Sequence, residues 1–340
     1  MPARPAPRSV DVKADVLSDV LRAVRLTGAV YFDFELSSPW VAEAPPSREI
    51  AGKVMPGAER VIEYHVIARG TCWGHAVGQE PIRLREGDLI VFPQGDAHVL
   101  SSAPGMRAAP DMSAFARPST PLPLVYELGG GGPERARVVC GFLGCDERPY
   151  NPLLTALPTV IHLSGAGPQA STGWLGTLLN IAVRESGSAR AGGENVLARL
   201  SELMFVEAIR RYLETLPPAQ TGWLAGLRDP VVGHALAALH GEPSESWTVE
   251  RLARLVGLSR SVLAERFTEL VGQPPMQYLA LWRMQLASRL LVEGGQVAAV
   301  AGAVGYESEA AFSRAFKKLV GQAPATWRRG TVPVAVSLRP

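Results

Sequence analysis

The chain has 340 residues, of which 47% are hydrophobic, so it is long enough for two domains with real cores. Its formal net charge is only +2, which by itself identifies no class of partner. Three cysteines in a chain of this length argue against a secreted disulfide framework, and no run of about 18 apolar residues predicts a membrane span. We therefore expect a cytoplasmic protein with no membrane partner.

The first half of the chain has the pattern of a β domain. Residues 15–26 place apolar side chains at helical spacing and predict a short helix. From residue 28 onward the pattern changes to short β-rich runs separated by Gly, Pro and Asp. These runs cover residues 30–36, 60–67, 71–77, 81–85, 88–92 and 98–100. Many short strands at close spacing predict a sandwich or barrel of the jelly-roll kind.

One stretch within this domain is more specific. Residues 87–98 resemble the second cupin motif, in which a glycine turn, a strand and a Pro-x-Gly turn bring His98 to the mouth of a barrel. Metal-binding cupins carry His-x-His followed by Glu in the first motif. Here Glu63-Tyr64-His65 keeps only the second histidine, and residues 66–69 lack the acid. The resemblance therefore implies a cupin-like fold and gives less support to a metal.

Helical periodicity follows the β domain. Apolar residues begin one helix at residues 174–183 and line a broad face of a second at residues 194–216. Two adjacent amphipathic helices favour a dimer seam, and the alternative is that they only cover the barrel. Residues 217–222 contain two prolines and a glycine and predict a linker.

The C-terminal third contains one helical motif twice. Residues 259–275 recur 49 positions later as residues 308–324, with seven identical positions, and residues 252–257 similarly match residues 300–305. Each copy predicts a helix, a glycine turn, a second helix and a glycine stop, which is the arrangement of a helix-turn-helix. Residues 229–340 hold 12 Lys and Arg against 9 Asp and Glu, so the basic excess lies with this repeat.

Helical projection separates a buried side from an outward side in each second helix. The predicted buried residues are Leu263, Phe267, Leu270, Val271, Phe312, Phe316, Leu319 and Val320. On the outward side, Arg314 suits guanine or phosphate, Lys317 suits phosphate, and Glu265 suits cytosine N4. A solvated surface, or a salt bridge for Glu265, is the alternative. The predicted DNA contacts are Arg260, Ser261, Ala264, Glu265, Arg266, Thr268, Glu309, Ala310, Ser313, Arg314, Lys317 and Lys318.

The order of elements in residues 229–329 resembles the C-terminal domain of AraC/XylS-family transcription regulators. The similarity is carried by Trp247-Thr-Val-Glu-Arg-Leu-Ala, by Met276-Gln-Tyr-Leu-Ala-Leu-Trp-Arg-Met and by Val304-Gly-Tyr-Glu-Ser-Glu-Ala-Ala-Phe-Ser-Arg. The resemblance implies a homodimer that binds double-stranded promoter DNA and activates transcription by contacting RNA polymerase. It also implies that the N-terminal domain responds to a signal.

These inferences give an α+β chain with four parts. We assign a cupin-like sensor domain with its N-terminal helix to residues 1–172 and a helical dimerisation and linker segment to residues 173–222. An AraC-type double helix-turn-helix DNA-binding domain covers residues 223–330, and a tail covers residues 331–340.

Three interpretations of the sensor domain compete. The barrel binds a small organic effector near His65, Trp73 and His98, or it holds an ion such as Zn²⁺ through His65, His98 and a thiolate from Cys72 or Cys140. In the third, Cys72, Cys140 and Cys145 form a redox switch, which requires an exposed thiol of low pKa. Alternatively, the cysteines are small buried hydrophobic residues.

A cupin metalloenzyme fused to a DNA-binding domain is the alternative function. A catalytic metal needs three protein ligands and an open position, and the first motif lacks the usual His and Glu. We therefore expect a regulator and not an enzyme.

Overall fold

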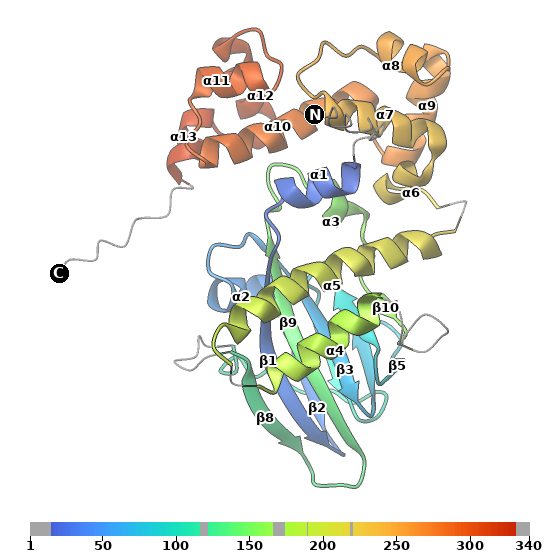
Figure 1. Cartoon of the computed structure of the whole chain (residues 1–340), viewed down its shortest axis with the longest axis vertical. Coiled ribbons are helices and arrows are strands. Elements are labelled where there is room, and N and C mark those ends of the chain that lie inside the picture. Colours follow the sequence, from blue (N-terminus) through green and yellow to red (C-terminus); the bar gives the residue numbers. More distant parts are fainter. Residues whose placement is uncertain (1–14, 116–121, 166–173, 189, 218–219, 331–340) are drawn as a thin grey trace, which may run out of the picture. The chain divides into compact units, whose positions relative to one another are not determined.

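A computed structural model of the chain describes residues 15–115, 122–165, 174–188, 190–217 and 220–330 (Figure 1). The predicted tail at 331–340 lies outside the described residues. The chain forms two compact units. The first, called the β unit, comprises residues 24–147 and 154–216. The second, called the helical unit, comprises the chain up to Ala23, residues 148–153 and the chain from Pro217 onward.

Two sheets build the β unit, in agreement with the predicted short-strand architecture. The six-stranded sheet has the order β10 (Ile161–Leu163), β6 (Leu89–Phe92), β3 (Arg60–Arg69), β9 (Arg135–Cys145), β1 (Thr27–Ser37) and β8 (Leu124–Gly129). The four-stranded sheet has the order β2 (Val41–Ala44), β7 (His98–Ser101), β4 (Thr71–Ala76) and β5 (Ile82–Arg85). Neighbouring strands run antiparallel except β1 and β8, which are parallel.

The hydrophobic core of the β unit draws on both sheets. Phe32 and Phe142 come from the six-stranded sheet, and Leu84 and Leu100 come from the four-stranded sheet. The short helix α2 (Ser47–Val54) adds Ile50 to the same core. The inner faces of the two sheets therefore pack against each other, as in other two-layer β folds.

Helices α4 (Trp174–Ser186) and α5 (Gly193–Thr215) lie across the six-stranded sheet (Figure 1). The approach of α5 is close, because a Cβ atom at Gly28 of β1 would lie 2.4 Å from the carbonyl oxygen of Ala198. The helices thus cover the sheet, as the alternative interpretation expects. They also leave apolar side chains exposed, and these are Trp174, Ile181, Val196 and Leu203.

The helical unit contains the two predicted helix-turn-helix motifs, joined by the long helix α10 (Figure 1). The first motif is α8 (Val249–Leu255) and α9 (Arg260–Val271), and the second is α11 (Val297–Ala303) and α12 (Glu309–Val320). The remaining helices described in this unit are α1 (Val16–Ala23), α6 (Trp223–Arg228), α7 (Pro230–Gly241), α10 (Pro275–Val292) and α13 (Pro324–Gly330); α3 (Pro152–Ala156) begins in residues 148–153.

Equivalent residues begin and end α9 and α12. The hydroxyl oxygens of Ser259 and Ser308 accept hydrogen bonds from the backbone N–H groups of Val262 and Ala311. Both helices end at a glycine in the left-handed region, with φ values of 82° at Gly272 and 88° at Gly321. The identities in the repeat therefore encode helix boundaries.

The predicted buried side of the repeat is correct for its central residues and wrong for one terminal residue. Phe267 and Phe316 are fully buried, whereas Leu319 is 36% exposed. The core cluster around Phe312 and Phe316 includes Val320 and does not include Leu319. Helical projection gives the direction of a side chain but not how far the neighbouring helices extend along it.

A buried aromatic cluster joins α7 to α10. The Tyr278 hydroxyl accepts a hydrogen bond from Trp223 Nε1 at 2.9 Å and lies 2.7 Å from His240 Nε2. The ring of Trp282 stacks on His240 with centroids 4.1 Å apart. Burial lowers the pKa of His240 to about 3, and its nearest carboxylate is Asp19 of α1, 3.8 Å from Nδ1.

One chain segment that precedes the β unit and one that interrupts it belong to the helical unit. The buried side chain of Gln285 in α10 donates to the carbonyl oxygen of Ala23 and accepts from the backbone N–H of Tyr150. Tyr150 also accepts a hydrogen bond from Gln273 Nε2 at 2.6 Å. The N-terminal helix, predicted as part of the sensor domain, is α1, and its contacts group it with the helical unit. Among the described residues, no helix is both long and apolar enough to cross a membrane.

We predict that acid weakens the helical unit through His240. The folded pKa is lowered, so the unfolded chain binds a proton near pH 6.5 that the folded chain does not bind. Stability contributed by neutral His240 is present above about pH 6.5 and falls toward pH 3, by at most about 1.4 kcal/mol per pH unit. Hydrogen exchange of α7 and α10 peptides at pH 7 and pH 5 should show this loss in the wild-type chain and a smaller loss in His240→Gln. Equal losses in both chains would contradict the assignment.

Candidate functional site

Strand β3 directs alternate side chains to opposite faces of its sheet. Tyr64 faces α5, where its hydroxyl forms a short hydrogen bond with Ser201. Glu63 and His65 face the interior between the two sheets, where they are 2% and 7% exposed. The period of the strand therefore places a carboxylate and an imidazole side by side inside the β unit.

These two side chains lie at a cavity of about 270 Å³ within the β unit. Its wall is mainly apolar and aromatic, and its buried polar side chains include Glu63, His65, His98 and the Cys140 thiol. The apolar lining residues include Phe32, Phe34, Leu36, Trp40, Leu100, Phe115, Val138 and Phe142. An apolar cavity with a few convergent polar groups is typical of a small-ligand site.

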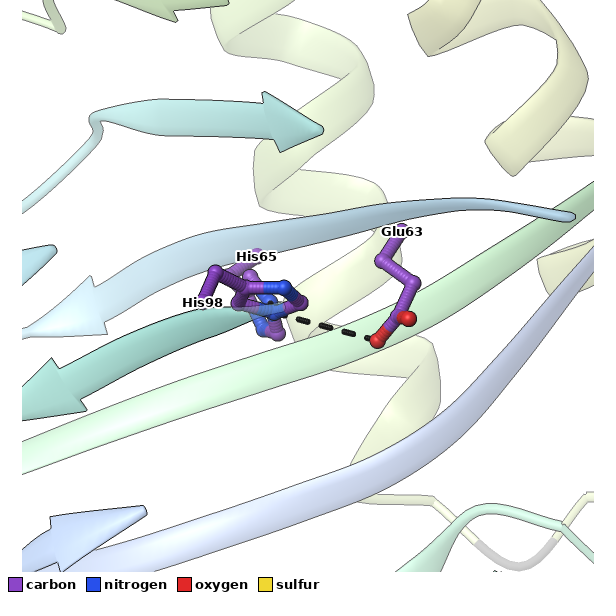
Figure 2. Close-up of side chains that lie close together, drawn as sticks. All are labelled: Glu63, His65 and His98. Carbon is purple, nitrogen blue, oxygen red and sulfur yellow. Dashed lines mark hydrogen bonds and ion pairs between the residues drawn. The ribbon is translucent and has the colours of Figure 1, made fainter. Parts of the chain in front are cut away.

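Glu63, His65 and His98 converge from the two sheets (Figure 2). The Nε2 atoms of His65 and His98 are 2.7 Å apart, and Glu63 Oε2 lies 3.7 Å from His98 Nε2. One potential ligand atom from each residue lies within 4.8 Å of the other two. Such a group of two imidazoles and one carboxylate fits a divalent transition metal.

The outer nitrogen of each imidazole has its own partner. His98 Nδ1 lies 3.0 Å from the carbonyl oxygen of Asp96, so it carries the proton and donates to that oxygen. Its ring also stacks on Phe92, with centroids 3.8 Å apart. His65 Nδ1 lies 2.8 Å from the Sγ atom of Cys140. These contacts hold the rings so that both Nε2 atoms point toward each other.

Burial disfavours the charged form of each of these groups. It raises the pKa of Glu63 to about 8 and lowers the pKa of His98 to about 4. Burial, and then the neighbouring His98, lower the pKa of His65 well below its usual value. Glu63 Oε1 also has no hydrogen-bond partner among the described residues.

The structure brings together some of the residues that sequence analysis names for the sensor and leaves others outside. His65 and His98 meet, whereas Trp73 does not line the cavity and lies one residue from the inward-facing Cys72 on β4. Cys140 contacts His65 through Nδ1, on the side of the ring away from His98. Cys72 is buried in the core and does not line the cavity.

Sequence reasoning missed Glu63. The first motif lacks the usual His and Glu, yet it places two possible metal ligands, Glu63 and His65, in the same cavity. The signal was present in the sequence as a spacing of two residues within a predicted strand. The motif of metal-binding cupins has a histidine at this position, so similarity to that motif does not reveal Glu63.

None of the cysteines has the exposed, low-pKa thiol that a redox switch requires. All three are free and buried. Burial, with a smaller contribution from Asp88, raises the pKa of Cys72 to about 12. Burial also raises the pKa of Cys145 to about 12 and that of Cys140 well above its ordinary value. The geometry is that of small buried side chains.

The predicted DNA-contacting side chains form the outward faces of α9 and α12, and none of them is buried. They are Arg260, Ser261, Ala264, Glu265, Arg266, Thr268, Glu309, Ala310, Ser313, Arg314, Lys317 and Lys318. Most equivalent positions 49 residues apart have the same exposure, because the two helices pack through equivalent aromatic residues, Phe267 and Phe316. The helical unit thus presents two related helix surfaces.

The basic side chains on these two surfaces differ in their partners. Arg260 pairs with Glu250 at 2.9 Å, and Arg266 pairs with Asp229 at 2.5 Å. Asp229 also caps α7, since its side chain accepts hydrogen bonds from two backbone N–H groups at the start of that helix. Within the described part of the chain, Arg314, Lys317 and Lys318 of α12 have no ion-pair partner. These three positions are therefore free to meet an external anion.

Comparison with known proteins identifies the two parts. A family model described as cupin matches residues 15–214, and one described as a helix-turn-helix domain matches residues 252–330. A putative AraC-like transcription regulator from Streptomyces lividans is 37% identical over 276 residues, which are 80% of this chain and 88% of that protein. The HTH-type transcriptional regulator AlkR from Acinetobacter baylyi is 29% identical over 277 residues, 78% of this chain and 90% of that protein.

Among solved structures, the chain is similar to the DNA-binding domain of AdpA in complex with a target DNA. That match has 34% sequence identity, a TM-score of 0.28, and covers 30% of this chain and 92% of the other. The family models account for the cupin-like and helix-turn-helix parts, and the relative from Streptomyces lividans spans both. The chain therefore belongs to the AraC-like transcription regulators, with an N-terminal cupin domain and a C-terminal helix-turn-helix domain that binds DNA.

Proposed function

We propose that this regulator binds promoter DNA as a homodimer through α9 and α12, and that the cavity of the β unit binds the effector. The observation that supports the DNA surface most strongly is the pair of equivalent, exposed helix faces carried by a repeated scaffold. Second helices of this motif enter successive major grooves when they are about 34 Å apart. We further propose that the bound dimer activates transcription by contacting RNA polymerase, as the family resemblance implies.

The two helices have different roles in this proposal. The unpaired cations Arg314, Lys317 and Lys318 give α12 most of the attraction to phosphate. On α9, the two arginines are engaged in ion pairs, and exposed Glu265 lies between small residues that permit close approach to bases. Helix α9 then contributes mainly to discrimination between base pairs.

A dimer seam on α4 and α5 is supported by the apolar side chains that the sheet does not cover. Val196 and Leu203 are each 45% exposed, although neighbouring Leu197, Leu200 and Met204 are buried. A second copy of the same strip would bury these side chains in an isologous contact. The covering role and the dimer role therefore use different sides of α5.

The relatives favour a regulator over a fused metalloenzyme. They are named transcription regulators, and this chain matches them over most of their length. The number of available ligands no longer separates the two functions, because Glu63, His65 and His98 meet in the cavity. We propose that the cavity senses and does not catalyse. Its volume of about 270 Å³ suits a small molecule or an ion.

The first prediction from this proposed function separates a DNA contact from a structural ion pair. Arg314→Ala should weaken specific promoter binding by about 1–3 kcal/mol with little change in thermal stability. Arg266→Ala should instead lower the stability of the helical unit, because it removes the partner of Asp229. Fluorescence anisotropy with a target promoter and thermal unfolding provide the two readouts. If Arg314→Ala leaves affinity and specificity unchanged, Arg314 does not read DNA.

The second prediction concerns the dimer. Leu203→Glu should shift the chain from dimer to monomer at micromolar concentration, because it places a charge in the proposed apolar contact. Sedimentation equilibrium measures the change, and Glu214→Gln on the exposed end of α5 serves as the control. A dimer of unchanged affinity in Leu203→Glu would exclude this strip as the seam.

The third prediction concerns the cysteines. In the native protein, iodoacetamide should modify Cys72, Cys140 and Cys145 far more slowly than in the unfolded protein, because the thiols are buried and their pKa values are raised. Mass spectrometry of tryptic peptides gives the rate for each cysteine. Rapid native modification of any one of them would restore the redox interpretation for that residue.

A further inference from the structure

We propose that Glu63, His65 and His98 form a binding site for one divalent first-row transition metal ion at the wall of the cavity. The inference rests on the proposed sensor role of this cavity and names the ion as part of what it holds. Cys72 and Cys140, which sequence analysis considered as ligands, are not in this ligand set.

The carboxylate of Glu63 provides the first argument. It is 2% exposed, one oxygen has no partner among the described residues, and the other is 3.7 Å from an imidazole nitrogen. A buried carboxylate without hydrogen bonds or a counter-charge is costly. A cation between Glu63 and the two histidines would supply both the charge and the missing contacts (Figure 2).

The orientation of His98 provides the second argument. Because its Nδ1–H donates to the carbonyl oxygen of Asp96, its Nε2 presents a lone pair toward the cavity. This pairing of a ring N–H with a backbone carbonyl is the usual support of a metal-bound histidine. His65 has the same arrangement when its Nδ1–H donates to Cys140 Sγ, which leaves its Nε2 as a second ligand atom. Cys140 is then a positioning residue.

The two imidazole nitrogens are at hydrogen-bond distance, a little closer than two ligands of one shared ion. The two Nε2 atoms are 2.7 Å apart, whereas two imidazoles on one tetrahedral ion at about 2.0–2.1 Å lie about 3.3 Å apart. A shared ion would replace the proton between these two nitrogens and would require them to move apart by about 0.6 Å. Two nitrogens and one carboxylate are too few oxygen donors for Ca²⁺ and are typical of zinc, iron, cobalt or nickel.

The surroundings leave part of the ion accessible from the cavity. The neighbouring wall includes Phe32, Phe142 and Leu100, none of which has a ligand atom. Three protein ligands leave at least one coordination position open on a tetrahedral ion. An effector with an oxygen or nitrogen donor and an apolar body would suit both the ion and this wall.

Metal titration of the chelator-treated full-length protein tests the proposal. Isothermal titration with Zn²⁺ and absorption spectroscopy with Co²⁺ should show one ion per chain, with Co²⁺ d–d bands and no thiolate-to-cobalt charge-transfer band. Glu63→Gln and His98→Gln should each lower the affinity at least about tenfold, which is the lower end of the loss from removing even an outer-shell partner. The ion should also raise the unfolding temperature of the wild-type chain and not that of Glu63→Gln.

Two control variants sharpen this experiment. His162→Gln alters a histidine of the β unit outside the cluster, and its amide still can donate to Asp88, so its metal affinity should stay within about twofold of wild type. Cys140→Ala should keep the d–d bands, because the thiol is not a ligand. Circular dichroism of each variant verifies that it is folded.

Three results would overturn the proposal. They are no stoichiometric binding by the wild-type chain, unchanged affinity in folded Glu63→Gln, or a thiolate charge-transfer band that Cys140→Ala abolishes. Promoter binding, measured on the same metal-free and metal-loaded samples, distinguishes failure of the metal site from failure of the proposed DNA-binding function. If the protein binds its promoter but no metal ion, only the ion site is rejected. If it binds the metal ion but no promoter, the proposed DNA-binding function is rejected.

Discussion

Burial of polar side chains on β3 is the constraint on which the β unit depends. The strand lies between β6 and β9 with both faces covered, so each polar residue on it must find a partner away from water. Tyr64 finds Ser201 of α5 on one face. On the other face, the polar partners of Glu63 and His65 within the described part of the chain are His98 and Cys140, beside the cavity. Because side chains of β3 alternate between the two faces, the strand both binds α5 through Tyr64 and places a carboxylate and an imidazole in the cavity.

The helix-turn-helix part could be predicted from the sequence almost completely, because its information is local. Serine caps, glycine stops and the phenylalanines at helical spacing specify each helix within a few residues. The cavity could be predicted only in part. His98 follows a recognisable turn, but the pairing of His65 with His98 joins two sheets across 33 positions, and the partner of Arg266 lies 37 positions away. Such pairings depend on how strands and helices pack, which spacing alone does not reveal.

Helices α9 and α12, which we propose to contact DNA, show how a repeated scaffold can differ in electrostatics without differing in fold. Their buried residues are equivalent, so both helices have the same support. Arg266 contacts Asp229, the cap of α7, whereas the equivalent position of α12 is Ala315 and the neighbouring Arg314 has no ion-pair partner among the described residues. One arginine stabilises a neighbouring helix while the other stays available. The two arginines carry the same charge, so their different roles follow only from their surroundings.

The inequality of α9 and α12 has a consequence for the DNA. In the proposed docking, one chain presents Ser261, Ala264 and Glu265 to one groove and Arg314 and Lys317 to the next, so it has no internal two-fold symmetry. The sequence it recognises then has a polarity, and inverting that sequence would present each helix with the wrong half. The DNA site for one such chain is thus directional and not palindromic. In the proposed dimer, two such sites would occur as direct or inverted repeats according to the symmetry that relates the two chains.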